Sequence, residues 1–122
     1  MRFPGALFFA VTVAVLVGCR QAQPPARAHY EPTEAERATW PRTVDEAATR
    51  ILADMKGADK TRVRETKRED LIFFHHGWGT GIRNEFGLWK GNTNLLADCH
   101  AHHPDDASMV IIEAVWQRLQ KP

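Results

Sequence analysis

Apolar side chains recur at helical spacing over much of the chain, and the first such run follows residue 43. Thr43 and Glu46 form a Thr-x-x-Glu pattern, which is the capping-box signature of a helix N-terminus. Apolar residues three and four positions apart continue to Met55, and Gly57 is a stop signal. They are Val44, Ala47, Ala48, Ile51, Leu52 and Met55. This pattern predicts a helix from residue 44 to just before Gly57, with one buried face.

Further segments of the chain carry helix signals. Thr66 and Glu69 repeat the capping-box pattern ahead of an apolar segment. Asn92 is a suitable N-cap, and Pro104 suits the first position of a last helix. The predicted helical segments are 58–65, 66 onward, 93–99 and 104–119. No alternating strand pattern is convincing, so the sequence predicts an all-α domain, a compact bundle of four or five helices.

The central stretch, residues 75–89, reads HHGWGTGIRNEFGLW and allows two interpretations. If a helix from Thr66 continues through it, six large apolar side chains share a stripe about 120° wide, at about 100° per residue. They are Leu71, Phe74, Trp78, Ile82, Phe86 and Trp89. Glycines 77, 79 and 81 oppose this helix, because each costs up to about 1 kcal/mol relative to alanine.

We favour the continuous helix, in which Gly77 and Gly81 let another helix or a tryptophan approach the backbone closely. In the alternative, the helix breaks near Gly77 and a new one begins around Thr80, so that the histidines face a cleft. The continuous helix places His75 and Glu85 on the flanks of the apolar stripe, where burial requires polar partners. We therefore expect His75 and Glu85 in a buried polar network. Its candidate partners are Arg83, Asn84, Glu113 and Gln117.

Other polar residues of this region are candidates for a surface that binds a ligand or a partner. They are His76, Arg83, Asn84 and Lys90. We interpret the domain as a binding module for another protein or a small polar ligand, and not as an enzyme. No serine, cysteine or threonine stands in a pattern that establishes an activated nucleophile.

The N-terminus has the pattern of a secretory signal. Arg2 precedes an apolar run from Ala6 to Val17, which is shorter than the roughly 20 residues that a bilayer span needs. The end of this run, Leu16-Val17-Gly18-Cys19, resembles the lipobox of bacterial lipoproteins. We therefore expect cleavage of residues 1–18 and lipidation of Cys19. The absence of aspartate at position 20 favours the outer membrane, with the domain facing the periplasm.

Residues 19–38 are rich in proline, alanine and mixed charges, which predicts a flexible tether ahead of a small helical domain over residues 39–122. The chain has 16 basic and 15 acidic residues, so removal of Arg2 with the signal leaves equal numbers. A neutral chain has no general attraction to nucleic acid, and we expect none as a partner.

A second cluster, CHAHHPDD at residues 99–106, contains ligand types for zinc or copper. Its candidate ligands are Cys99, His100, His102 and His103. The spacing lacks the two separated pairs typical of zinc sites, so we expect a buried structural Cys99 and a solvated loop, with no cofactor. The alternative function is a metal-binding or hydrolytic enzyme that uses this cluster with His75 and His76.

Several motifs occur in order along residues 40–119 and resemble a family of small bacterial domains of unknown function. They are WPRTVDEA, EDLIFFHHGWGTGIRNEFGLWKGN, LLADC and HPDDASMVIIEAVWQRL. The resemblance implies that these segments form one domain, and it transfers no activity, ligand or catalytic residue. It also implies that His100 and His102 are local additions to the family pattern, which weakens the metal interpretation.

Overall fold

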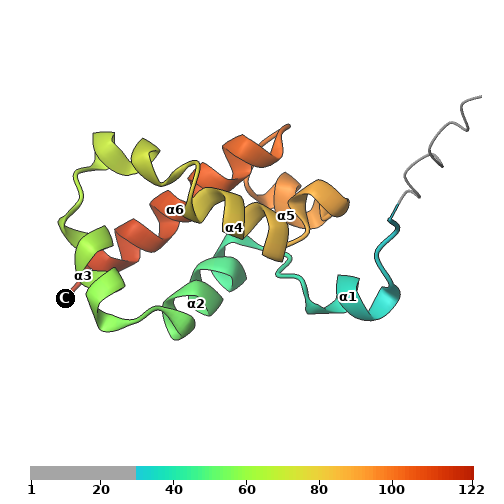
Figure 1. The fold of residues 1–122 in the computed structure, drawn as a ribbon, viewed down its shortest axis with the longest axis horizontal. Helices are drawn as coiled ribbons and strands as arrows, with labels where there is room; N and C mark the ends of the chain where they lie inside the picture. Colours follow the sequence, from blue (N-terminus) through green and yellow to red (C-terminus); the bar gives the residue numbers. More distant parts are fainter. Residues whose placement is uncertain (1–29) are drawn as a thin grey trace, which may run out of the picture.

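A computed structural model of the chain describes residues 30–122 and shows an all-α domain, as predicted (Figure 1). The described residues form six α-helices and two 3-10 helices, with no strand among them. The helices are α1 (Glu34–Thr39), α2 (Val44–Asp54), α3 (Gly57–Glu65), η1 (Arg68–Phe74), α4 (Trp78–Glu85), η2 (Leu88–Lys90), α5 (Thr93–Asp98) and α6 (Pro104–Gln120).

The long C-terminal helix α6 forms the centre of the domain. It contacts α2, α3, α4, α5 and η1, and Figure 1 shows it running through the middle of the bundle. One face of α6 is fully enclosed, and its members are Ala107, Ser108, Ile111, Ile112 and Val115. The apolar residues at three- and four-residue spacing on α2 and α4 meet this face, which is how the amphipathic pattern becomes one core.

Most of the predicted helix starts are confirmed. The Thr43 side chain accepts a hydrogen bond from the Glu46 backbone N–H, and that of Asn92 accepts one from the Leu95 N–H. Pro104 occupies the first turn of α6, where its missing N–H costs nothing. These caps depend only on neighbouring residues, so the sequence was sufficient to predict them.

The prediction of a second capping box at Thr66 and Glu69 is wrong. Thr66 ends α3, and its hydroxyl donates to the Arg62 carbonyl at 2.8 Å instead of opening a new helix. The Thr66 carbonyl in turn accepts a hydrogen bond from the Trp116 indole at 2.8 Å. This long-range bond to α6 holds the chain in a turn between α3 and η1.

The prediction of a continuous central helix is also wrong. The alternative break near Gly77 is confirmed, although the new helix begins at Trp78 and not around Thr80. The 3-10 helix η1 ends at Phe74, and α4 begins at Trp78 after Gly77. The expected stripe therefore holds only in part. Leu71, Ile82 and Phe86 are buried and Phe74 and Trp78 partly so, whereas Trp89 is 53% exposed.

Other atoms of the chain approach Gly79 closely, and not Gly77 or Gly81 as expected. A Cβ on Gly77 or Gly81 would meet nothing within 4 Å. One on Gly79 would lie 3.0 Å from an Arg83 nitrogen and 3.3 Å from the Phe74 carbonyl oxygen. Gly79 is therefore the residue that makes room on the buried side of α4.

The expected flexible tether needs correction over its last part, because residues 34–39 form α1. Thr33 and Glu36 make a reciprocal capping box at its start. The Tyr30 ring lies under the Lys90 ammonium at 4.7 Å, and the Tyr30 hydroxyl donates to Glu36. This hydrogen bond lowers the pKa of Glu36 and raises that of Tyr30. Residues 1–29, which include the predicted signal and Cys19, lie outside the described part of the chain.

Candidate functional site

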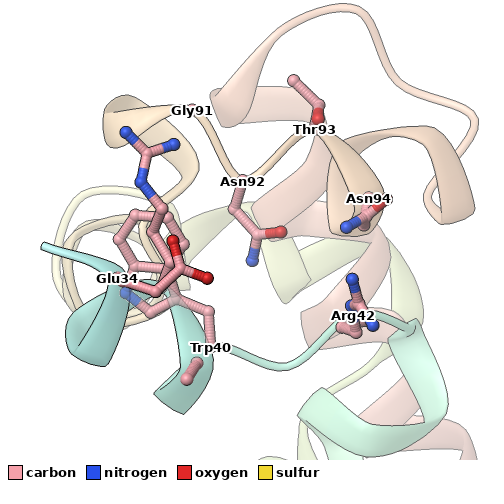
Figure 2. A pocket seen from close by; sticks show the side chains of 9 residues that line it. Glu34, Trp40, Arg42, Gly91, Asn92, Thr93 and Asn94 are labelled. Atoms are coloured by element: carbon pink, nitrogen blue, oxygen red, sulfur yellow. The ribbon is translucent and has the colours of Figure 1, made fainter. Parts of the chain in front are cut away.

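A polar pocket of about 520 Å³ lies between α1 and the start of α5 (Figure 2). We call it the Trp40 pocket, and its lining residues are Glu34, Arg37, Ala38, Trp40, Arg42, Gly91, Asn92, Thr93 and Asn94. Figure 2 shows Glu34 and Trp40 on one side of the hollow and Arg42 and Asn94 on the other. The pocket is formed by segments about fifty positions apart in the chain.

Trp40 is held against the backbone of Gly87. Gly87 has a φ of 67°, and a Cβ built there would lie 2.3 Å from the Trp40 ring. Only glycine leaves room for the indole at this position and adopts the left-handed conformation without strain. The ring is thus supported from behind while it lines the pocket.

Asn92 forms the floor of the pocket and joins three parts of the chain. Its side-chain nitrogen donates to the carbonyls of Pro41 at 2.9 Å and Phe86 at 2.8 Å, and its oxygen caps α5. The residue is buried with every polar atom of its amide engaged. Asn92 therefore fixes the distance between the Trp40 segment and α5.

The charged side chains that line the pocket differ in whether they already have hydrogen-bond or ion-pair partners. Arg37 donates to the Pro32 carbonyl at 3.3 Å and to the Glu31 carboxylate at 3.4 Å. The side chains of Glu34 and Arg42, by contrast, make no hydrogen bond or ion pair with any residue between 30 and 122. A carboxylate and a guanidinium are thus available to a ligand on opposite sides of the pocket.

Arg83, predicted as a surface residue, is buried at 5% exposure. Its guanidinium donates to the hydroxyls of Ser108 at 2.8 Å and Thr80 at 2.9 Å and to the His75 carbonyl at 3.3 Å. Its Nε lies 3.2 Å from an Asp105 carboxylate oxygen. We call these five residues the Arg83 network, and they join α4 to the first two turns of α6.

Glu85, predicted as part of a buried network, is exposed. His75 is partly buried, and its Nε2 lies 3.9 Å from the Asp105 carboxylate, so it belongs to the Arg83 network and not to a pair with Glu85. The buried charge of this region is therefore Arg83, two residues before the expected glutamate. Arg83 follows Ile82 and lies four residues from Gly79, a spacing that indicates the same helix face.

The other candidate surface residues, His76, Asn84 and Lys90, are exposed as expected. Within residues 30–122, none of the three hydrogen-bonds or ion-pairs with another. Lys90 contacts the Tyr30 ring, while the His75 and His76 rings meet edge to face at 4.9 Å between centroids. No contact between the three residues groups them within this part of the chain, and a binding surface formed by them stays a prediction.

The candidate metal ligands do not converge either. Cys99 is buried at 4% exposure, as expected for a structural thiol, whereas His100, His102 and His103 are exposed. Burial, with a smaller effect of Asp98, raises the pKa of the Cys99 thiol to about 11, so the thiolate is scarce at neutral pH. In the part of the chain that the structure describes, no three His, Cys, Asp or Glu side chains are grouped to hold a metal ion.

The Trp40 pocket was not predicted from the sequence. The available signals were the Trp40-Pro41 pair at the start of the domain, the N-cap Asn92 and the glycines at 87 and 91. Each has an ordinary structural meaning alone. Their convergence depends on how α1 and α5 meet, which no local pattern specifies.

None of the helices over residues 30–122 is both long and apolar enough to span a bilayer. No curated protein and no solved structure matches the chain. The motifs that run from Trp40 to Leu119, and that form the single core described above, coincide with a family match over residues 40–119. The chain therefore belongs to the family described as Domain of unknown function (DUF6794).

Proposed function

We propose that this protein is a lipid-anchored, non-enzymatic binding module of the bacterial envelope, which holds a small zwitterionic ligand in the Trp40 pocket. The observation that carries the proposal is a pair of opposite charges, Glu34 and Arg42, across a polar hollow of about 520 Å³, with neither side chain engaged by any of residues 30–122. A ligand with an ammonium at one end and a carboxylate at the other matches both. Free amino acids and short peptides have this chemistry.

The Arg42 side of the pocket suits the carboxylate. A guanidinium binds a carboxylate through two parallel hydrogen bonds, which are stronger than those between neutral groups. Asn94 lies on the same side, and Thr93 also lines the pocket, so an amide and a hydroxyl are further donors.

The Glu34 side suits the ammonium. Its carboxylate offers charge-assisted hydrogen bonds, and the Trp40 ring offers an aromatic face, which attracts cations. Gly87 and Asn92 hold this arrangement in place before a ligand arrives, and such preorganisation reduces the entropy lost on binding.

Binding to Ala-Ala and its blocked forms, measured by calorimetry on the full chain, tests the ligand class. We expect Arg42→Gln to weaken Ala-Ala binding about tenfold and to have little effect on the C-terminal amide. Glu34→Gln should weaken binding of the free dipeptide and leave binding of its N-acetyl form unchanged, because the N-acetyl form has no ammonium. Arg64→Gln, an exposed arginine on α3, is the matched control. Absence of binding by any form, or equal losses for Arg42→Gln and Arg64→Gln, would refute the proposal.

The anchor is supported by the Leu16-Val17-Gly18-Cys19 sequence and the apolar run before it. Several acyl chains hold a protein on a membrane firmly, whereas one chain holds it only marginally. Because α1 contributes Glu34, Arg37 and Ala38 to its lining, the Trp40 pocket lies where the chain enters the domain. On an anchored chain this side is the one tied to the membrane, which we infer to be the outer membrane.

Replacement of Cys19 tests the anchor. In a bacterial host we expect Cys19→Ser to abolish incorporation of radiolabelled palmitate and to remove the mature chain from the membrane fraction, because the acyl chains have lost their attachment atom. Cys99→Ser is the control, since Cys99 is buried in the domain. Continued labelling of the Cys19→Ser chain would contradict the assignment.

A further inference from the structure

An apolar groove of about 360 Å³ lies away from the Trp40 pocket, between α3 and the segment from η1 to the start of α4. We call it the Phe73 groove, and its lining residues are Met55, Asp59, Arg62, Val63, Phe73, Phe74, Gly77 and Trp78. Phe73 is 80% exposed, more than any other large apolar side chain that the structure describes. An exposed ring beside an apolar hollow is typical of a contact surface.

The groove contains both halves of a self-complementary contact. Phe73 is largely exposed at the groove, and Val63, Phe74 and Trp78 line the same hollow of about 360 Å³, which is large enough for a phenyl ring. In a twofold dimer the same patch meets itself, so each protomer must offer a projecting group and the hollow that receives it. The Phe73 groove offers both within one patch.

The charges on the rim fit the same symmetry. Asp59 and Arg62 lie three positions apart on α3, and so share one helix face. If two copies of α3 run antiparallel across a twofold axis, each Asp59 lies opposite the Arg62 of the other copy. Neither residue forms an ion pair with another of residues 30–122, although Arg62 lies over the Phe74 ring at 5.6 Å.

We propose that the Phe73 groove binds a second copy of this chain, with Phe73 of each protomer inserted into the groove of the other. The proposal is independent of the ligand proposed above, because the groove and the Trp40 pocket share no lining residue. Arg62 and Asp59 orient the two copies, and the apolar groove supplies the favourable burial.

Sedimentation equilibrium of the full chain in density-matched detergent tests the association. We expect a monomer–dimer equilibrium, and Phe73→Ala should raise its dissociation constant at least about tenfold, because truncation of a central aromatic anchor removes much of the binding energy. Trp89→Ala is the control, because Trp89 is an exposed aromatic outside the groove. A monomeric wild-type chain, or equal effects of the two substitutions, would overturn the proposal.

Exchanging the charges of Asp59 and Arg62 tests the antiparallel arrangement of the two α3 helices separately. Asp59→Arg and Arg62→Asp each place like charges opposite one another across the axis, so each should weaken the dimer. The double variant restores opposite charges across the axis and should recover most of the lost association. A double variant as weak as the sum of the single ones would exclude the antiparallel arrangement proposed.

Discussion

Gly87→Ala should lower the free energy of unfolding by about 3 kcal/mol, the largest effect we expect from any methyl group added to this domain. Two costs combine. The backbone at Gly87 has a φ of 67°, where an L-residue is strained by roughly 1–2 kcal/mol. The new Cβ would also lie 2.3 Å from the Trp40 indole, so the ring must leave its position. Urea unfolding followed by circular dichroism measures the change.

Gly91→Ala separates these two costs. Gly91 has a φ of 93°, but a Cβ there meets nothing within 4 Å, so we expect only the backbone strain of roughly 1–2 kcal/mol. The difference between the two variants measures the clash with Trp40. If both variants lose the same stability, Trp40 moves aside freely and the Trp40 pocket is not held in shape by Gly87.

Arg83→Met should destabilise the domain by about 3 kcal/mol, although it replaces a charged residue with an apolar one in the interior. The substitution leaves the Asp105 carboxylate without its 3.2 Å partner and removes the guanidinium donors to Ser108 and Thr80. The cost falls mainly on the interior, because Ser108 is fully enclosed and water cannot replace the lost guanidinium donor there, whereas the Asp105 side chain is 38% exposed and remains partly solvated. Urea unfolding again provides the measurement.

Arg68→Met is the matched control for the Arg83 network. Arg68 also pairs with a carboxylate on α6, that of Glu113, but its side chain is 67% exposed. Such surface pairs contribute about 0–1 kcal/mol, since water and salt screen them. Equal losses for the two arginines would mean that the Arg83 network contributes no more than a surface contact.

The helices of this protein were largely predictable because their signals are local. Thr43, Asn92 and Pro104 each act on backbone groups within a few residues of themselves. The error at Thr66 shows the limit of such signals. The sequence does contain the Thr-x-x-Glu pattern, yet Thr66 ends α3 and does not start a helix. A long-range hydrogen bond from Trp116 to its carbonyl stabilises this arrangement.

Arg83 was expected at the surface and is buried, whereas Glu85 was expected to be buried and is exposed. The break at Gly77 is the physical cause of both errors. A helix that restarts at Trp78 has no fixed rotation relative to the preceding 3-10 segment, so a helical wheel carried through the break loses its meaning. Within α4 alone, Arg83 shares the face of Gly79 and Ile82. A charged residue on that face is unexpected until Ser108 and Asp105 of α6 are known to lie opposite.

The family, the all-α class and most helix starts follow from the sequence by itself, because motif order, apolar spacing and capping residues act over short distances along the chain. Only the tertiary structure decided that Trp40 rests on Gly87, that Asn92 joins the Pro41 segment to α5, and that Arg83 is buried. These contacts join residues far apart in the chain, and their geometry depends on the packing of every helix around α6.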